Sequence, residues 1–166
     1  AGEGYHIVSL IKNNFFADGI AFESETESQN LLKDNLKLNN IENKVKIYGE
    51  ANFDLIKKLN VQNVNKTLFL IDIEGEEFNL LNNSFLELFK TSYFVIEMHE
   101  FILKDKQKVK NFYELIEKNF HTHLIKNNCV NLYEIKELNL VSDNVRMLGL
   151  SENRPSKMNW LFLEPK

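Results

Sequence analysis

The chain has 166 residues, 43% of them hydrophobic and 27% charged, which is the composition of one globular domain with a sizeable core. A formal net charge of −4 without a basic and aromatic stretch argues against nucleic acid as a partner, and no apolar run is long enough to span a membrane. The single cysteine, Cys129, cannot form an intrachain disulfide and favours a reducing, cytoplasmic location.

The first predicted elements follow a glycine turn, Gly2-Glu3-Gly4. Apolar residues at helical spacing predict a helix over residues 5–13, and residues 19–23 predict a short strand that ends in Glu23. Glycines let a ligand approach the backbone, a helix N-terminus offers free N–H groups, and a carboxylate about twenty residues later accepts hydrogen bonds from ribose hydroxyls. These features favour a nucleoside-containing cofactor over the alternative of an ordinary turn and a capping carboxylate.

A helix, a strand and a weaker helix come next. Ser24, three residues before Glu27, has capping-box spacing, and Thr26 is a rival N-cap for a helix with Leu32 and Leu36 on its inner side. Alternation predicts a strand over residues 44–48, and a weak helix follows over residues 53–59.

The middle of the chain alternates apolar strands with amphipathic helices. Residues 67–73 and 93–98 are nearly continuous apolar runs, which is typical of strands buried on both faces. Helices are predicted over residues 78–89, with Leu88 facing inward, and over residues 104–119. Four short strands that pair antiparallel are predicted after His121, over residues 122–125, 131–135, 145–150 and 160–163. We therefore predict an α/β three-layer sandwich of one domain, residues 1–166, with a mostly parallel sheet and antiparallel C-terminal strands.

Acidic residues close the first of the two buried strands, where open parallel sheets bind their ligands. Asp72 lies between two isoleucines inside the apolar run, so we favour a functional role for it over that of a helix N-terminal acid. Glu76 and Glu77 are interpreted as acids of the latter kind, stabilised by the helix dipole.

The second buried strand ends in Glu97 and His99, which strand alternation places on the same side. His99 can serve as a general base near neutral pH, or it can be a hydrogen-bonded structural residue. With Asp72 and Glu97 it could instead bind a divalent cation, but spacing alone does not fix a coordination geometry, so the sequence assigns no metal. The catalytic candidates are His99, Asp72 and Glu97.

Other polar residues carry a weaker signal. His121 and His123 lie on one face of a predicted strand and are interpreted as surface residues. Arg154 and Trp160 fit a substrate contact no better than a loop arginine and a core tryptophan.

Five segments in this order resemble the FkbM-like family of S-adenosylmethionine-dependent methyltransferases: AGEGY, IAFESETESQNLLKDNLKLNN, LIDIEGEEFNLL, FVIEMHEF and NRPSKMNWLFLEP. The resemblance covers nearly the whole chain, and the DIEG-x-E segment is its most specific part. It implies a class I, Rossmann-like transferase with a seven-stranded sheet, which transfers a methyl group to an oxygen, often on a sugar or polyketide-like hydroxyl.

The resemblance also implies roles for residues at the strand ends. The glycine turn would lie along the amino-acid portion of the cofactor, Glu23 would take the ribose hydroxyls, and residues 48–51 would lie near the adenine. Asp72 and Glu74 would face the reactive end, with His99 across the cleft. The implied cofactor-binding residues are Gly2, Glu3, Gly4, Glu23, Ser24, Glu50, Ala51 and Asp72.

The start of the chain departs from the family pattern. Family members begin this region with a central strand that ends in an acidic residue and a first glycine, and neither precedes Gly2. Loss of a central strand would expose two sheet edges, so we expect the natural protein to continue upstream of Ala1.

The leading hypothesis is an S-adenosylmethionine-dependent O-methyltransferase acting on a small-molecule or carbohydrate hydroxyl. One alternative is a catalytically decayed ligand-binding or interaction domain of the same fold. A nicotinamide-dinucleotide oxidoreductase fits less well, because Gly4 is followed by Tyr5, His6 and Ile7 with no third glycine at the fingerprint position. The acceptor, a metal requirement and the oligomeric state, a homodimer included, stay open.

Overall fold

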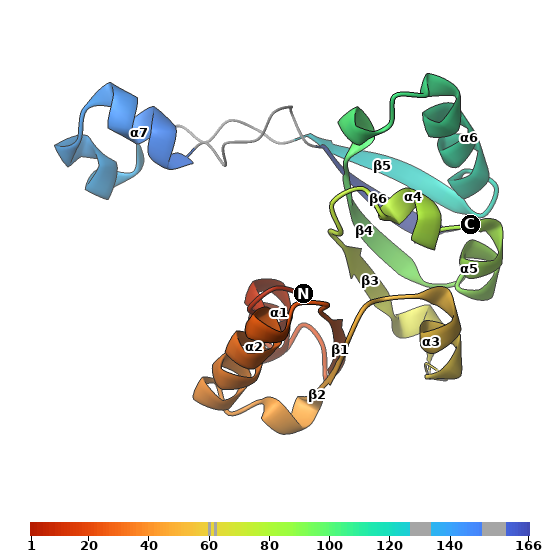
Figure 1. Cartoon of the computed structure of the whole chain (residues 1–166), viewed down its shortest axis with the longest axis horizontal. Helices are drawn as coiled ribbons and strands as arrows, with labels where there is room; N and C mark the ends of the chain where they lie inside the picture. Colours follow the sequence, from red (N-terminus) through yellow and green to blue (C-terminus); the bar gives the residue numbers. More distant parts are fainter. Residues whose placement is uncertain (60, 62, 127–133, 151–158) are drawn as a thin grey trace. The chain divides into compact units, whose positions relative to one another are not determined.

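The computed structural model describes residues 1–59, 61, 63–126, 134–150 and 159–166. These residues form two compact units, residues 1–62 and 63–166. The helices are α1 (Tyr5–Lys12), α2 (Thr26–Leu38), α3 (Phe53–Lys58), α4 (Glu77–Leu80), α5 (Asn83–Leu88), α6 (Lys106–Ile116) and α7 (Asp143–Leu150) (Figure 1). The strands are β1 (Gly19–Phe22), β2 (Val45–Tyr48), β3 (Leu68–Ile71), β4 (Tyr93–Met98), β5 (Phe120–Lys126) and β6 (Asn159–Pro165).

In the first unit, α1 and α2 pack on a parallel pair of strands, β1 and β2. Gly4 precedes α1 with a φ of 93°, and a Cβ atom there would lie 2.3 Å from the Leu32 side chain, so glycine is required at this close approach. The core of the unit draws on both helices and both strands: Ile11, Ala21, Leu32, Leu36, Ile41 and Val45. This packing holds the glycine turn against α2.

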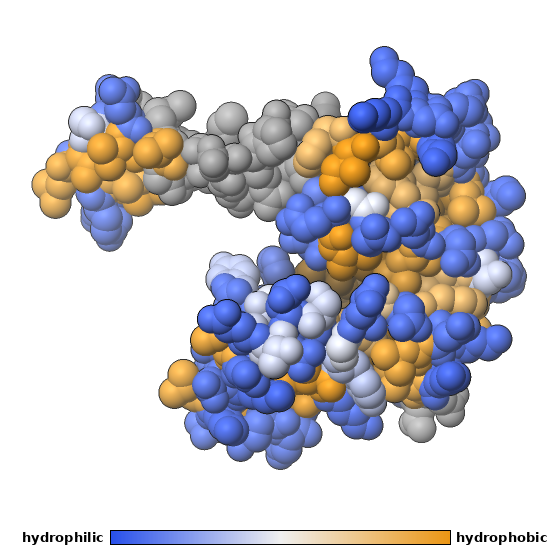
Figure 2. Space-filling view, in the orientation of Figure 1, coloured by the Kyte–Doolittle hydropathy of each residue, from blue (hydrophilic) through white to orange (hydrophobic). Residues whose placement is uncertain are grey.

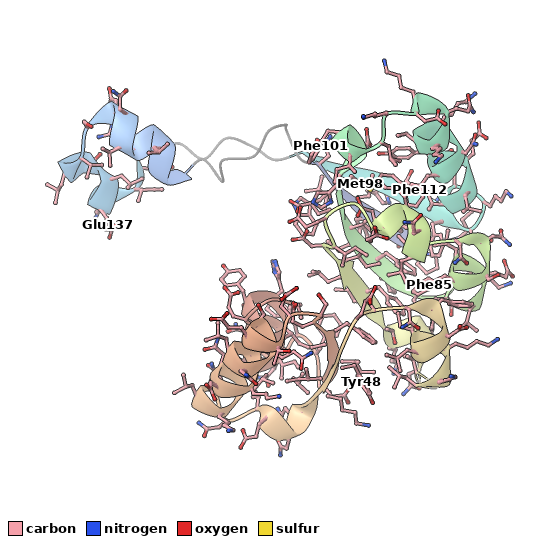
Figure 3. All side chains as sticks on the ribbon, viewed as in Figure 1. Tyr48, Phe85, Met98, Phe101, Phe112 and Glu137 are labelled. Atoms are coloured by element: carbon pink, nitrogen blue, oxygen red, sulfur yellow. The ribbon has the colours of Figure 1, made fainter. Side chains whose placement is uncertain are left out.

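In the second unit, four strands form a sheet in the order β3-β4-β6-β5. β3 and β4 are parallel, whereas β6 runs antiparallel to both β4 and β5. Aromatic rings fill the core beside this sheet: Phe69, Phe85, Phe89, Phe94 and Phe120 (Figure 3). The predicted α/β class, with parallel strands first and antiparallel strands at the C-terminal end, is confirmed.

The helix predicted over residues 78–89 is two short helices instead. The Asn82 side chain caps α5, since its Oδ1 accepts hydrogen bonds from the N–H groups of Ser84 (3.0 Å) and Phe85 (3.1 Å). An N-cap residue is not helical, so the chain breaks between α4 and α5. Leu88 is exposed, contrary to its predicted inward position.

The strand predicted over residues 145–150 is wrong, because this segment is the helix α7. The buried Arg146 side chain contacts the Asp143 carboxylate and donates to the carbonyl oxygens of Leu138 (3.0 Å) and Val141 (3.1 Å). These bonds join the first turn of α7 to the preceding segment. Val145 and Leu148 are exposed, and Figure 2 shows the apolar surface of this segment in orange.

Three smaller expectations also have outcomes. Neither Ser24 nor Thr26 caps α2, because Glu25 is the N-cap residue and its side chain makes no capping bond. Of the strand predicted over residues 131–135, residues 131–133 lie outside the described residues, and 134–135 are not in a strand. No helix among the described residues has the length and apolar character needed to cross a bilayer.

Candidate functional site

Glu23 directly follows β1, and its carboxylate is bound by the glycine turn. Oε2 accepts hydrogen bonds from the Gly2 N–H (2.6 Å) and the Ala1 amino group (2.9 Å), while Oε1 accepts one from the Glu25 N–H (2.9 Å). Partial burial opposes ionisation, but the bonds from Glu25, the amino group and Gly2 outweigh it and lower the pKa of Glu23 to about 2. Glu23 is therefore ionised at neutral pH and held in one orientation.

Other residues of the predicted cofactor set lie near the same strand ends. The Glu23 N–H donates to the Tyr48 carbonyl oxygen at 3.1 Å, so the chain segments that leave β1 and β2 begin side by side. Ser24 follows Glu23, and Glu50 and Ala51 follow β2, with Ser24 and Glu50 exposed. Glu3 lies in the glycine turn, and Asp72 belongs to the second unit.

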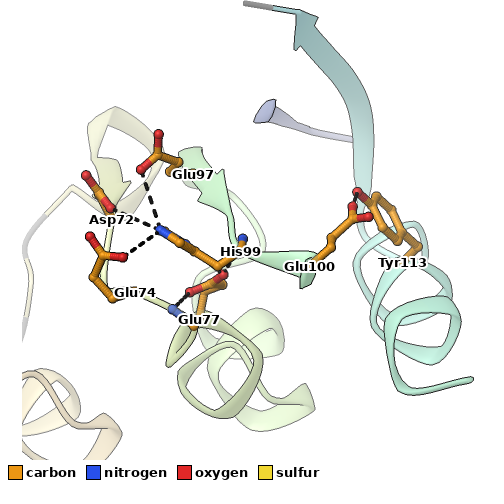
Figure 4. Close-up of polar contacts among 8 residues, drawn as sticks. Asp72, Glu74, Glu77, Glu97, His99, Glu100 and Tyr113 are labelled. Carbon is orange, nitrogen blue, oxygen red and sulfur yellow. Dashed lines mark hydrogen bonds and ion pairs between the residues drawn. The ribbon is translucent and has the colours of Figure 1, made fainter. Parts of the chain in front are cut away.

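The three catalytic candidates lie together at the carboxyl ends of β3 and β4. These strands are parallel neighbours, with Ile71 opposite Ile96, so Asp72 and Glu97 come to the same edge of the sheet. His99 Nε2 lies 3.8 Å from Asp72 Oδ1 and 3.7 Å from Glu97 Oε2 (Figure 4). One atom from each residue lies within 4.8 Å of the others.

Glu74 adds another carboxylate to this group. Its Oε2 lies 3.2 Å from His99 Nε2, although the side chain is 82% exposed. The backbone of Glu74 is left-handed, with a φ of 53°, and that of Gly75 follows with a φ of 104°. This turn after β3 carries the Glu74 carboxylate to the histidine.

Glu77 is the residue that sequence reasoning missed. Its interpretation as a helix N-terminal acid is confirmed by its place at the start of α4, but the side chain is also fully buried there. Its Oε1 accepts from the His99 N–H (2.8 Å) and lies 3.2 Å from His99 Nδ1, and its Oε2 accepts from the Gly75 N–H (2.9 Å). Glu77 thus orients the histidine ring, and the 22 positions between them leave no local signal in the sequence.

The two ring nitrogens of His99 have different surroundings: Nδ1 contacts Glu77, whereas Nε2 lies among the other carboxylates. An ionised carboxylate only accepts hydrogen bonds, so Glu77 favours the tautomer with a proton on Nδ1. The buried Nε2 makes no well-directed hydrogen bond with any described residue. Oxygens of Asp72, Glu74 and Glu97 lie 3.2–3.8 Å from Nε2.

Residues near this cluster have other partners or positions. Glu100 accepts a hydrogen bond from the Tyr113 hydroxyl at 2.5 Å, and burial together with this carboxylate raises the pKa of Tyr113 (Figure 4). His121 and His123 are exposed on β5, which confirms their interpretation as surface residues. Trp160 is half-buried on β6, while Arg154 and Cys129 lie outside the described residues.

The fold belongs to a known class of structure, the Rossmann-like methyltransferase fold. The chain is similar to an O-methyltransferase from Bacillus cereus in complex with SAH, with a TM-score of 0.56 and 10% identity over 99% of this chain and 80% of that one. It is similar to the O-methyltransferase TomG from Streptomyces achromogenes, involved in tomaymycin synthesis and in complex with SAM, with a TM-score of 0.56 and 11% identity over 99% and 80%. It is also similar to the METTL16 methyltransferase domain, with a TM-score of 0.54 and 11% identity over 99% of this chain and 56% of that one.

At these identities the similarity establishes the fold. No family model and no curated protein matches the chain. Membership of the FkbM-like family therefore stays a prediction from the sequence segments.

Proposed function

We propose that the protein is an S-adenosylmethionine-dependent methyltransferase that methylates a hydroxyl oxygen of a small molecule or carbohydrate. The observation that carries the proposal is Glu23, an ionised carboxylate that follows a parallel strand and is bound by the glycine turn. In this fold, such a carboxylate suits the ribose of a nucleoside cofactor. Cytoplasmic location and FkbM-like membership are part of the same proposal.

The cofactor would bind along the strand ends of the first unit. Backbone donors occupy part of the acceptor capacity of the Glu23 carboxylate and fix its direction, and the remaining lone pairs suit ribose hydroxyls. Gly2, Glu3 and Gly4 would follow the amino-acid portion, because glycine permits close backbone approach. Ser24 would lie beside Glu23, and Glu50 and Ala51 would lie near the adenine.

The acceptor hydroxyl would be activated by Asp72, Glu97 and His99. Methyl transfer needs an aligned nucleophile and removal of the hydroxyl proton. The Asp72 side chain is 33% exposed, so an acceptor can reach it, while His99 and Glu97 are buried behind it. The hydroxyl proton would therefore pass to Asp72 first, and from it to Nε2 of His99 when nothing else is bound there.

Isothermal titration of the protein with SAH and with S-adenosylmethionine tests the proposal. We expect micromolar affinity, and an affinity loss of at least about tenfold in Glu23→Gln, which corresponds to about 1.4 kcal/mol. Glu25→Gln is the matched control, because Glu25 is an exposed neighbouring carboxylate and should bind as the wild type does.

The possible outcomes separate the hypotheses. Absence of binding to both compounds would refute the proposal and favour a decayed interaction domain. If NAD stabilises the protein against unfolding more than S-adenosylmethionine does, the oxidoreductase hypothesis is favoured. If Glu23→Gln binds SAH and S-adenosylmethionine as tightly as the wild type does, this carboxylate does not recognise the ribose.

A further inference from the structure

Four carboxyl groups surround His99, and two of them, Glu77 and Glu97, are buried with it. Glu77 and His99 are fully buried and Glu97 is 2% exposed. Buried carboxylates are costly unless they are paired or bind a metal. Among the described residues, the His99 ring is recorded in contact with all three of Asp72, Glu74 and Glu97.

His99 itself points to a ligand. Glu77 holds Nδ1, so the neutral ring presents an unprotonated Nε2 to the carboxylate oxygens. Nε2 is buried and lacks a directed hydrogen bond to any residue that the structure describes. Lone pairs facing lone pairs repel each other, and a cation between them turns this repulsion into attraction.

The geometry points to a binding site for one divalent transition-metal cation, formed by Asp72, Glu97 and His99. With metal–ligand bonds of roughly 2.0–2.2 Å, neighbouring ligand atoms lie about 3.0–3.6 Å apart. The observed distances from Nε2, 3.8 Å to Asp72 and 3.7 Å to Glu97, exceed that spacing by only a few tenths of an ångström. Small rotations of the two carboxylates are enough to close the site.

The ligand set indicates which cations fit. Imidazole suits zinc and iron, whereas carboxylates alone suit magnesium, calcium and manganese, so one nitrogen with two oxygens favours Zn²⁺ or Mn²⁺. Glu77 behind Nδ1 is the outer carboxylate that orients a metal-binding histidine. Three protein ligands leave coordination positions for water or an acceptor, and the exposed Glu74 is near enough to fill one.

The cation would also change how the acceptor hydroxyl is activated. A bound metal lowers the pKa of a coordinated hydroxyl, so His99 would act as a ligand and not as the base. This consequence rests on the proposed function. Cation binding itself does not, because it needs neither cofactor nor acceptor.

The test is calorimetric titration of chelator-treated protein with Zn²⁺ and, separately, Mn²⁺. We expect one equivalent to bind, with affinity at least about tenfold weaker in Asp72→Asn, an isosteric change at a partly exposed position. His123→Gln is the matched control, because His123 lies near a different carboxylate, Glu164, at 3.6 Å on the exposed face of β5. It should bind the cation as the wild type does.

A second readout identifies the nitrogen ligand. The chain has four histidines, so ¹⁵N-histidine labelling gives a small set of ring signals. Zn²⁺ should shift the Nε2 signal of one ring, assigned to His99 by its Nδ1 proton. This observation would not follow from weak binding at surface residues.

The proposal is overturned if neither cation binds, if Asp72→Asn binds as tightly as the wild type, or if His123→Gln loses as much affinity. Titration of the same samples with SAH keeps the two proposals apart. Cofactor binding without cation binding removes the metal site and leaves the methyltransferase, and the converse result removes the methyltransferase only.

Discussion

Replacing Glu77 by glutamine tests whether this buried carboxylate holds the cluster together. The substitution keeps the shape of the side chain and removes its charge. In the wild type, one carboxylate serves the N–H groups of His99 and Gly75 and the His99 ring. We expect Glu77→Gln to lower the free energy of unfolding and to loosen the ring.

The expected loss follows from these contacts. The glutamine oxygen can replace only one carboxylate oxygen, so its NH₂ group faces a donor: the Gly75 N–H if it takes the place of Oε2. One buried unsatisfied donor costs about 1–3 kcal/mol. The bonds that remain become neutral and weaken, and the lower cost of burying an amide offsets part of this effect. We expect a net loss of about 2 kcal/mol.

Urea denaturation followed by far-UV circular dichroism measures this loss. Glu76→Gln is the matched control, since the neighbouring Glu76 is exposed and accepts from the Asn79 side chain at 2.8 Å. The free energy of unfolding of the control should stay within about 0.5 kcal/mol of the wild-type value. The ¹⁵N spectrum of the ring should show a proton fixed on Nδ1 of His99 in the wild type and a tautomer mixture in Glu77→Gln.

Equal stability of the two variants would refute the reasoning. It would mean that the hydrogen bonds to the buried Glu77 stabilise the fold no more than the charge of an exposed carboxylate does. An unchanged ring spectrum would separately refute the role of Glu77 in setting the tautomer.

Two further predictions concern the core residue Phe85 and the carboxylate of Glu23. Phe85→Ala, which removes a fully buried ring in contact with Phe69 and Phe89, should cost about 3–5 kcal/mol in urea denaturation; a loss below 1 kcal/mol would contradict this packing. In the folded protein the pKa of Glu23 is about 2, below its ordinary value of 4.5. The ionised carboxylate therefore contributes fully to the free energy of unfolding above pH 4.5, and this contribution is lost as the pH falls towards 2. The stability difference between wild type and Glu23→Gln, at most about 3 kcal/mol, should therefore shrink on acidification, and a constant difference between pH 6 and pH 3 would exclude a lowered pKa.

The sequence predicted those elements whose pattern is local. β4 is found at its predicted bounds because its apolar run is nearly continuous and its neighbours are polar. The segment 145–150 was misread because a short aliphatic run does not distinguish strand from helix, and the contacts of Arg146 with the preceding segment decide it. The N-cap of α5 at Asn82 could have been predicted from the sequence, since asparagine is a preferred N-cap residue.

The site was predictable where strand ends define it and not where tertiary contacts do. Asp72, Glu97 and His99 come together because parallel neighbouring strands bring their carboxyl ends to one edge. The role of Glu77 depends on a partner 22 positions away, and its burial cannot be read from its neighbours in the chain. A single domain over residues 1–166 stays a prediction.

The burial of these groups bears on the choice between an enzyme and a decayed domain. A fold that had only to be stable would gain from apolar residues in these places, because well-packed apolar side chains stabilise a protein as well as buried ionic groups do, or better. Glu97, His99 and Glu77 are therefore a cost to folding, and a bound cation or a reacting hydroxyl gives that cost a function.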